Sequence, residues 1–97
     1  MKLMSKGEIK KYLIEYLKKN GVVKASIFGS LARNEDTSTS DIDILVQFEE
    51  SKSLLDLVGL KLELEEKFNR KIDILTYNSV NPLIKDYILK DEEVLYG

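Results

Sequence analysis

The chain of 97 residues is long enough for one domain with a modest core and too short for two of ordinary size, so we predict a single domain over residues 1–97. Hydrophobic residues make up 43% of the chain and charged residues 33%, which is the balance of a folded protein rather than a disordered one. The net charge of -2 argues against long nucleic acid as a ligand, and the absence of histidine and cysteine excludes disulfides, ordinary zinc sites and Ser-His or Cys-His nucleophilic pairs.

The first half of the chain shows one helical pattern followed by two strand patterns. Apolar residues recur at spacings of three and four from position 5, and Asn20-Gly21 ends that helix. Two segments rich in apolar and β-branched residues follow, and the first of them ends at Gly29-Ser30. The predicted elements are a helix over 5–20, a strand over 22–28, a short helical turn over 31–33, a loop over 34–40 and a strand over 41–48.

The second half continues the alternation of helices and strands. Ser53 is a candidate N-cap for a helix that extends to position 69. Residues 60–64 alternate as a strand would, but the length of the segment and its leucine, glutamate and lysine content favour the helix. A strand over 71–76 and a last helix that starts at Asn81-Pro82 follow.

The end of the chain leaves two alternatives open. The last helix carries four large apolar residues on one side, which either join the core or form a docking face: Leu83, Ile84, Tyr87 and Ile88. Residues 93–96 form either an edge strand or a frayed end. The order of the elements predicts a single α/β unit. No apolar run of about eighteen residues occurs and the N-terminus lacks a secretory signal, so we expect a cytoplasmic protein without a membrane partner.

Three aspartates lie in the predicted strands. Asp41 and Asp43 are two positions apart, so both side chains leave the same face of the strand, while Ile42 faces the core. Two close carboxylates repel each other unless a cation or a proton neutralises them. Asp73 also lies between isoleucines, and a neighbouring strand would bring it to the same face. With only oxygen ligands present, a bound metal would be a hard cation such as Mg²⁺ or Mn²⁺.

Each of these features also has an ordinary structural explanation. An aspartate that opens a strand is commonly a turn acceptor, which would account for Asp41 or Asp73 taken alone. Asp43 lies inside an apolar run where an unpaired acid has no structural reason to be, and we interpret it as functional. Gly29-Ser30 allows close approach of a phosphate to the backbone and offers a hydroxyl and an N–H, but such a pair is also common as a simple turn.

Taken together, these motifs resemble a known family. Gly29-Ser30 followed after ten residues by Asp41-x-Asp43 resembles the defining motif of the DNA polymerase β-like nucleotidyltransferase superfamily. The fuller strings SIFGSLAR and SDIDILV resemble its minimal nucleotidyltransferase (MNT) branch, whose members have about this length. The close resemblance covers residues 22–76. It implies the small nucleotidyltransferase fold, with a mixed central sheet and helices packed against it.

The resemblance implies a role for each matching residue. Asp41 and Asp43 would bridge two Mg²⁺ ions, and Asp73 would hold the ion beside the attacking hydroxyl and help to remove its proton. Gly29 and Ser30 would bind the triphosphate of ATP. Two metals held by carboxylates can supply most of the catalysis of nucleotidyl transfer, so the lack of histidine is no obstacle.

Arg33 matches the arginine of the Gly-Ser-x-Ala-Arg string of the family, which implies a place at the nucleotide site. From the residues alone, a contact with phosphate and a surface ion pair with Glu35 or Asp36 are equally good explanations. Asn34 departs from the glycine that is common after this arginine. Asparagine tolerates positive φ, so we expect the turn to persist.

The MNT branch also implies a biological setting, because its members are antitoxins that inactivate a HEPN-type RNase toxin by adding AMP to a tyrosine. We therefore expect an Mg²⁺-dependent nucleotidyltransferase that transfers AMP from ATP to a hydroxyl of such a partner in a hetero-oligomer. One alternative is a binding module that neutralises its partner by contact alone. Another is an enzyme that adenylylates a small molecule such as an aminoglycoside, although those relatives normally carry an additional domain.

Overall fold

In the computed structural model, which describes residues 4–37, 39–49 and 53–97, helices and strands alternate along the chain. Ser38 of the predicted loop lies outside the described residues, as does the start of the chain, residues 1–3. The elements in chain order are α1 (Lys6–Lys19), β1 (Val22–Phe28), α2 (Gly29–Ala32), β2 (Ile42–Phe48), α3 (Leu54–Phe68), β3 (Ile72–Thr76), the 3₁₀ helix η1 (Tyr77–Ser79), α4 (Pro82–Lys90) and β4 (Glu93–Tyr96).

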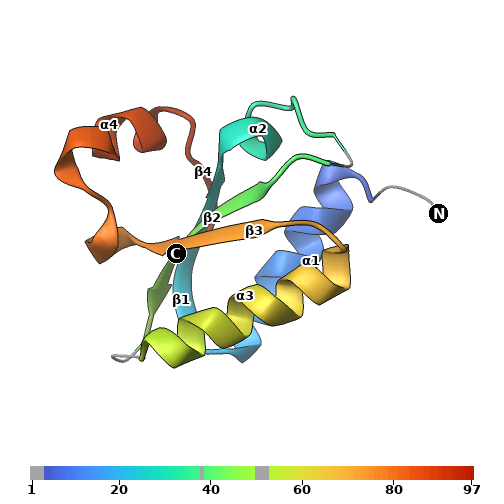
Figure 1. Cartoon of the computed structure of the whole chain (residues 1–97), viewed down its shortest axis with the longest axis horizontal. Helices are drawn as coiled ribbons and strands as arrows, with labels where there is room; N and C mark the ends of the chain where they lie inside the picture. The colour runs from blue at the N-terminus through green and yellow to red at the C-terminus, as the bar shows by residue number, and fades with distance from the viewer. Residues whose placement is uncertain (1–3, 38, 50–52) are drawn as a thin grey trace.

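One mixed sheet of four strands, in the order β3-β2-β1-β4, forms the centre of the fold (Figure 1). β1 is antiparallel to both β2 and β4, whereas β2 and β3 are parallel. A parallel pair needs a crossover connection, and α3 supplies it. The predicted α/β fold with a mixed sheet is thus confirmed, and the tail forms the edge strand β4.

The helix ends follow the signals in the sequence. Ser5 and Glu8 form a reciprocal capping box at the start of α1, with Ser5 N–H donating to Glu8 at 3.0 Å and Glu8 N–H donating to Ser5 at 3.1 Å. Ser53 starts α3 in the same way, and Asn69 ends it in the left-handed conformation at φ 52°. The period-two stretch 60–64 is helical, because a face with Leu60 and Leu64 buried at a spacing of four outweighs the local alternation.

The hydrophobic core lies between α1, α3 and one face of the sheet. Residues of β1, β2 and β3 that face this side of the sheet point into it, and α1 and α3 each supply residues one turn apart. Its fully buried members include Leu13, Leu17, Ile27, Ile42, Ile44, Leu64 and Ile72. Tyr12 and Tyr16 pack at its margin. Within the described residues, no helix is long and apolar enough to cross a lipid bilayer.

A substitution in the hydrophobic core should show how much the packing of α1 and α3 against the sheet stabilises the domain. We expect Leu13→Ala to lower the free energy of unfolding by about 2–5 kcal/mol, because Leu13 is 0% exposed and its removal leaves a cavity. The matched control is Leu83→Ala on α4, where the side chain is 91% exposed and the change should stay within about 0.5 kcal/mol. Urea denaturation followed by circular dichroism would measure both. Equal losses in the two variants would contradict the assignment of the core.

The opposite face of the sheet is covered in part by the excursion that contains α4 (Figure 1). Ser26 of β1 is completely buried, and its hydroxyl contacts the Tyr77 hydroxyl and the Glu92 carboxylate. Tyr77 also donates to Glu92 at 2.8 Å. These residues lie before and after α4, so both ends of the excursion are fastened to one point of the sheet. The sequence alone does not indicate this cluster, because its members are far apart in the chain.

α4 itself makes little contact with the sheet. Ile88 is 8% exposed, but the other three apolar residues predicted on its side are exposed: Leu83, Ile84 and Tyr87. The helix is therefore held at its base, by Ser26, Tyr77 and Glu92, and by Ile88. Its apolar side is mostly not part of the core.

Candidate active site

Two of the predicted acids meet on the face of the sheet opposite the core. Asp43 of β2 is level with Asp73 of β3 in the parallel pairing, and with Phe28 of β1 in the antiparallel one. Because Ile42 and Ile44 are fully buried in the core, alternation directs Asp43 to the other face. The same alternation directs the Asp73 side chain to that face, because Ile72 and Ile74 point into the core. The register of the sheet thus places two carboxylates side by side.

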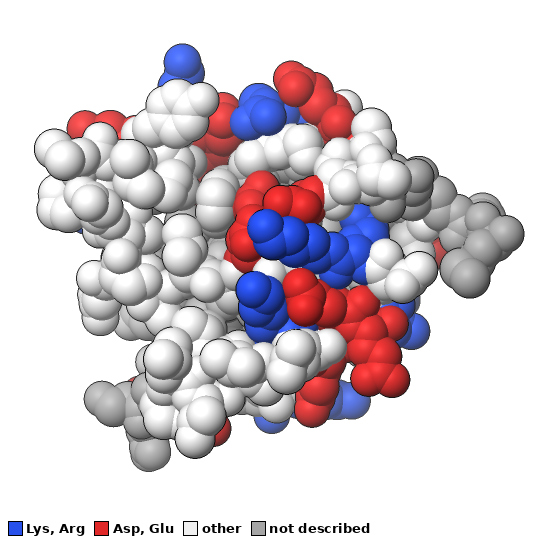
Figure 2. Space-filling view, in the orientation of Figure 1, with Lys and Arg blue, Asp and Glu red and all other residues white. Residues whose placement is uncertain are grey.

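The environment of Asp43 is short of positive charge. Burial raises the pKa of the Asp43 carboxyl from 3.8 to about 6, helped by the negative charge of Asp73, a hydrogen bond with Asp73 and the charge of Asp41. The guanidinium of Arg33 acts in the opposite direction and is the weakest of these influences. A carboxyl in this situation favours a bound proton or a bound cation. Figure 2 shows acidic side chains gathered between α2 and β3, with basic side chains directly beside them.

Asp41 is less closely joined to this pair. It immediately precedes β2, its side chain is 43% exposed, and its carboxylate lies 3.8 Å from the Lys71 ammonium. Across the described parts of the chain, no three acidic side chains are grouped so that they could hold a metal ion as they stand. Asp41 therefore acts on Asp43 through its charge, while Asp43 and Asp73 are in contact.

Gly29 packs against the acidic pair at the start of α2. Its φ of 69° lies in the left-handed region, and a Cβ at this position would come within 2.2 Å of Asp43 Oδ2. Both observations require glycine here. Ser30 follows in α2, and its carbonyl accepts from the Glu35 N–H at 2.8 Å, which folds the chain back after the helix. Asn34 adopts φ 63°, so the expected tolerance of asparagine for this turn is confirmed.

Arg33 ends α2 and forms ion pairs on the surface. Its Nη1 donates to Asp91 at 2.9 Å, and its Nε donates to Glu35 at 3.4 Å. The predicted surface ion pair of Arg33 with Glu35 or Asp36 is confirmed, with Glu35 as the partner. The other alternative, Asp36, pairs with Arg70. Asp91 was not anticipated, because it lies at the end of α4 and only the fold brings it to α2.

Comparison with known proteins identifies the chain. Residues 11–97 match the model of the family described as polymerase beta, nucleotidyltransferase. The chain belongs to this family. The resemblance carried by Gly29-Ser30 and Asp41-x-Asp43 is therefore confirmed, and the protein is a nucleotidyltransferase enzyme.

The relatives of this nucleotidyltransferase include named adenylyltransferases. It is 61% identical over 88 residues to MJ0435 of Methanocaldococcus jannaschii, provisionally named a protein adenylyltransferase, and the match covers 91% of this chain and 95% of the relative. It is 38% identical over 76 residues to the protein adenylyltransferase MntA of Thermococcus cleftensis, over 78% of this chain and 75% of the relative.

Solved structures share the fold of the nucleotidyltransferase. A protein described as a minimal nucleotidyltransferase superposes with a TM-score of 0.76 at 31% identity, over 93% of this chain and 95% of that one. A complex of a tri-AMPylated Shewanella oneidensis HEPN toxin with an MNT antitoxin superposes with a TM-score of 0.77 at 18% identity, over 96% and 73% of the two chains. At that identity, the second comparison shows the fold alone.

The donor set of this nucleotidyltransferase fits a divalent cation such as Mg²⁺. Asp43 and Asp73 present hard oxygen ligands in contact with each other, and burial together with the charge of Asp73 raises the pKa of Asp43, so an unneutralised charge is disfavoured there. Asp41 is close enough to act on Asp43 through its charge, and its own side chain is 43% exposed. Gly29 leaves room beside Asp43 that any other residue would fill.

This charge arrangement predicts how stability depends on pH without metal. The fold binds the Asp43 proton more tightly than the unfolded chain does, so the contribution of Asp43 to stability is greatest below pH 3.8 and is lost as pH rises through about 6. In EDTA at pH 7.5, we expect Asp43→Asn to unfold at a higher temperature than the original chain. A pKa difference of about two corresponds to at most about 3 kcal/mol, which partial exposure reduces to about 1–2 kcal/mol.

Thermal denaturation at several pH values would check this expectation. The advantage of Asp43→Asn should disappear near pH 4, where the Asp43 carboxyl is protonated in the folded protein. Asp86→Asn changes an exposed aspartate on α4 and serves as the control, with no stabilisation expected at either pH. If the melting temperatures of Asp43→Asn and the original chain differed by the same amount at every pH, the charge of Asp43 would be excluded as the cause.

Proposed function

We propose that this nucleotidyltransferase transfers AMP from ATP to a hydroxyl, most simply a tyrosine hydroxyl, of a partner HEPN-type toxin and thereby acts as its antitoxin. The single observation that carries the proposal is the contact between Asp43 and Asp73 directly beside Gly29 at the start of α2. The names of the relatives support the choice of a protein as acceptor and of AMP as the transferred group. We place this activity in the cytoplasm, within a complex of the two proteins.

The proposed reaction forms one bond and breaks another at the α-phosphorus of ATP. The acceptor oxygen bonds to the α-phosphorus, the bond to the oxygen that bridges the α- and β-phosphates breaks, and pyrophosphate leaves. Asp73 accepts the hydroxyl proton on a carboxylate oxygen and releases it to water. Mg²⁺, when bound by Asp41, Asp43 and Asp73, would spread the negative charge that develops on the phosphate oxygens.

The start of α2 gives this chain a place for the triphosphate. Gly29 lets a phosphate approach the backbone, and Ser30 offers its N–H and hydroxyl. Arg33 lies one turn further on, where exchanging its ion pairs with Asp91 and Glu35 for a phosphate would keep its charge paired. These residues would orient ATP so that the α-phosphorus faces the acidic pair.

A direct test combines the purified nucleotidyltransferase with Mg²⁺-ATP and the toxin encoded beside it. Intact-mass spectrometry of the toxin should show added adenylyl units, and a tyrosine should carry them in the digested protein. The toxin's RNase activity should fall in step with the modification. An unchanged toxin mass, together with full neutralisation by contact, would favour the binding module instead.

A further inference from the structure

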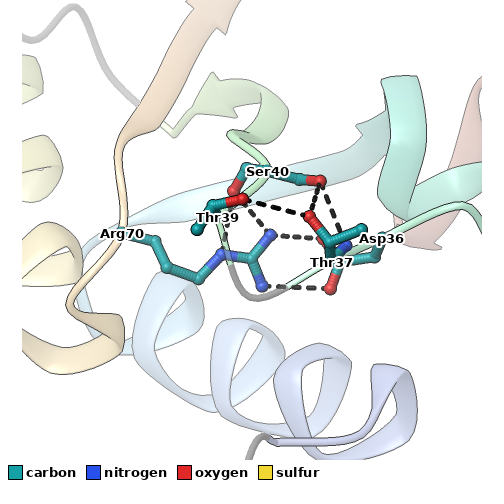
Figure 3. Close-up of polar contacts among 5 residues, drawn as sticks. All are labelled: Asp36, Thr37, Thr39, Ser40 and Arg70. Carbon is teal, nitrogen blue, oxygen red and sulfur yellow. Dashed lines mark hydrogen bonds and ion pairs between the residues drawn. The ribbon is translucent and has the colours of Figure 1, made fainter.

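The turn between α3 and β3 carries Arg70, a buried arginine that the proposed reaction does not use. Only 5% of its side chain is exposed. Its Nε and Nη2 donate to the Ser40 carbonyl at 2.9 and 2.7 Å, and its Nη1 donates to Asp36 Oδ2 at 3.0 Å. Nη2 also donates to Asp36 Oδ1. As Figure 3 shows, the guanidinium lies between two points of the loop that precedes β2.

These contacts join the two segments that lead into β2 and β3, the strands that carry Asp43 and Asp73. Ser40 is the residue before Asp41, and Arg70 is three positions before Asp73. The adjacent backbone bond, from the Ile42 N–H to the Lys71 carbonyl at 3.0 Å, closes the same junction. The guanidinium therefore fixes the backbone beside Asp41 relative to the backbone that leads to Asp73.

The loop presents the Ser40 carbonyl through a turn of its own. The Ser40 N–H donates to the Thr37 carbonyl at 3.2 Å, and the Thr37 N–H donates to Ser40 Oγ at 3.0 Å. Thr37 Oγ1 also lies 3.4 Å from Thr39 Oγ1 (Figure 3). The guanidinium contacts hold this turn, through the Ser40 carbonyl and Asp36, to the segment that leads into β3.

The position of this loop matters most for Asp41. Asp43 and Asp73 lie within strands, and the hydrogen bonds of the sheet fix their backbone. Asp41 lies just outside β2 with an exposed side chain, so its backbone depends on the loop. A buried ion pair contributes little net stability, whereas a planar guanidinium with several directed donors specifies geometry.

We propose that Arg70 is a positioning residue, which holds Asp41 within reach of the Asp43–Asp73 pair so that a divalent cation and nucleotide can be bound by all three acids. The proposal rests on the proposed function of the site. Arg70 touches neither metal nor substrate in this scheme and acts through the backbone of Ser40. Lysine carries the same charge but lacks the fork of donors, so Arg70→Lys tests the geometry rather than the charge.

The experiment compares the purified full chain with Arg70→Lys and Asp36→Asn. Mn²⁺ titration in the presence of a non-hydrolysable ATP analogue, followed by electron paramagnetic resonance, measures cation affinity without any reaction. AMP transfer to the toxin gives kcat and KM for ATP. We expect Arg70→Lys to weaken Mn²⁺ binding and to lower kcat by about 10–100-fold, the usual effect of removing a residue that orients metal ligands. Asp36→Asn keeps the Ser40 contacts and should have a smaller effect.

The control separates positioning from stability. Glu63→Gln removes the negative charge of the group that accepts a hydrogen bond from the Tyr16 hydroxyl between α1 and α3, on the side of the sheet opposite the acids. It should lower the melting temperature yet leave Mn²⁺ affinity and kcat unchanged. All measurements are made well below the melting temperatures of the variants.

Each outcome has one meaning. Unchanged Mn²⁺ affinity and kcat in folded Arg70→Lys would overturn the positioning role while leaving the proposed function intact. A chain that binds Mn²⁺ but never modifies the toxin would overturn the proposed function, and its Mn²⁺ affinity would still decide the role of Arg70. A chain that does not bind Mn²⁺ with nucleotide would overturn both.

Discussion

Replacing Asp43 by asparagine is expected to abolish AMP transfer, with a loss of about a thousandfold or more. The neutral amide cannot supply the negative charge that would hold a divalent cation, and cations of this kind contribute several kcal/mol to the stabilisation of phosphoryl transition states. Asp73→Asn should be equally inactive, because it removes both a ligand and the acceptor of the hydroxyl proton. Asp41→Asn should cost less, since Asp41 lies outside the contacting pair. Rates of toxin modification, measured by mass spectrometry, would give these values.

The same variants distinguish catalysis from neutralisation by contact. Asp43→Asn should still copurify with the toxin, since its change is confined to the acidic pair, but it should no longer protect cells that produce the toxin. Glu66→Gln, which removes one negative charge from an exposed position of α3, should retain both transfer and protection. Continued protection by Asp43→Asn would show that the acids are dispensable and that binding is enough.

Replacing Gly29 by alanine is expected to damage both the fold and the site. The positive φ of 69° costs about 1–2 kcal/mol for a residue with a Cβ, and the new methyl would lie 2.2 Å from Asp43 Oδ2 unless that carboxylate moves. A displacement of about 1 Å at a reacting centre can cost roughly a hundredfold in rate. We therefore expect transfer to fall by about a hundredfold or more, and the melting temperature to fall by several degrees.

Gly59→Ala is the matched control, because it makes the same chemical change inside α3. A Cβ at Gly59 meets no atom within 4 Å. Alanine has the higher helix propensity, so this variant should gain about 0.5–1 kcal/mol and keep full activity. Thermal denaturation and the toxin assay would be run on both variants together. Similar behaviour of the two alanines would refute the proposed role of the glycine beside Asp43.

The fold could be predicted largely from local patterns in the sequence. Ser5, Ser53 and Asn81 each begin a helix, because their side chains satisfy N–H groups that the helix leaves unpaired. The isoleucines on both sides of Asp43 and Asp73 indicated that these acids face away from the core. Both inferences hold because a helix start and the period of a strand are determined by near neighbours in the chain.

The parts that escaped prediction depend on contacts between distant residues. Nothing near Ser26 in the sequence indicates Tyr77 and Glu92 as its partners. Nothing near Asp36 in the sequence indicates Arg70 as its partner, because Arg70 reaches it only after α3 has crossed the sheet. Local patterns also could not predict the direction of the Asp41 side chain, because the alternation of side chains applies within a strand and Asp41 lies just outside β2.

Because both ends of the segment that contains α4 are attached to the sheet, this segment can change in sequence and length within the family. Tyr77 and Glu92 meet at Ser26, so the intervening segment is a closed loop whose exit and return points coincide. Lengthening such a loop costs little, since closure entropy grows only with the logarithm of its length. Insertions, deletions and wholesale exchange of residues 78–91 should therefore be tolerated during evolution, provided that the two anchors and an apolar residue in place of Ile88 persist.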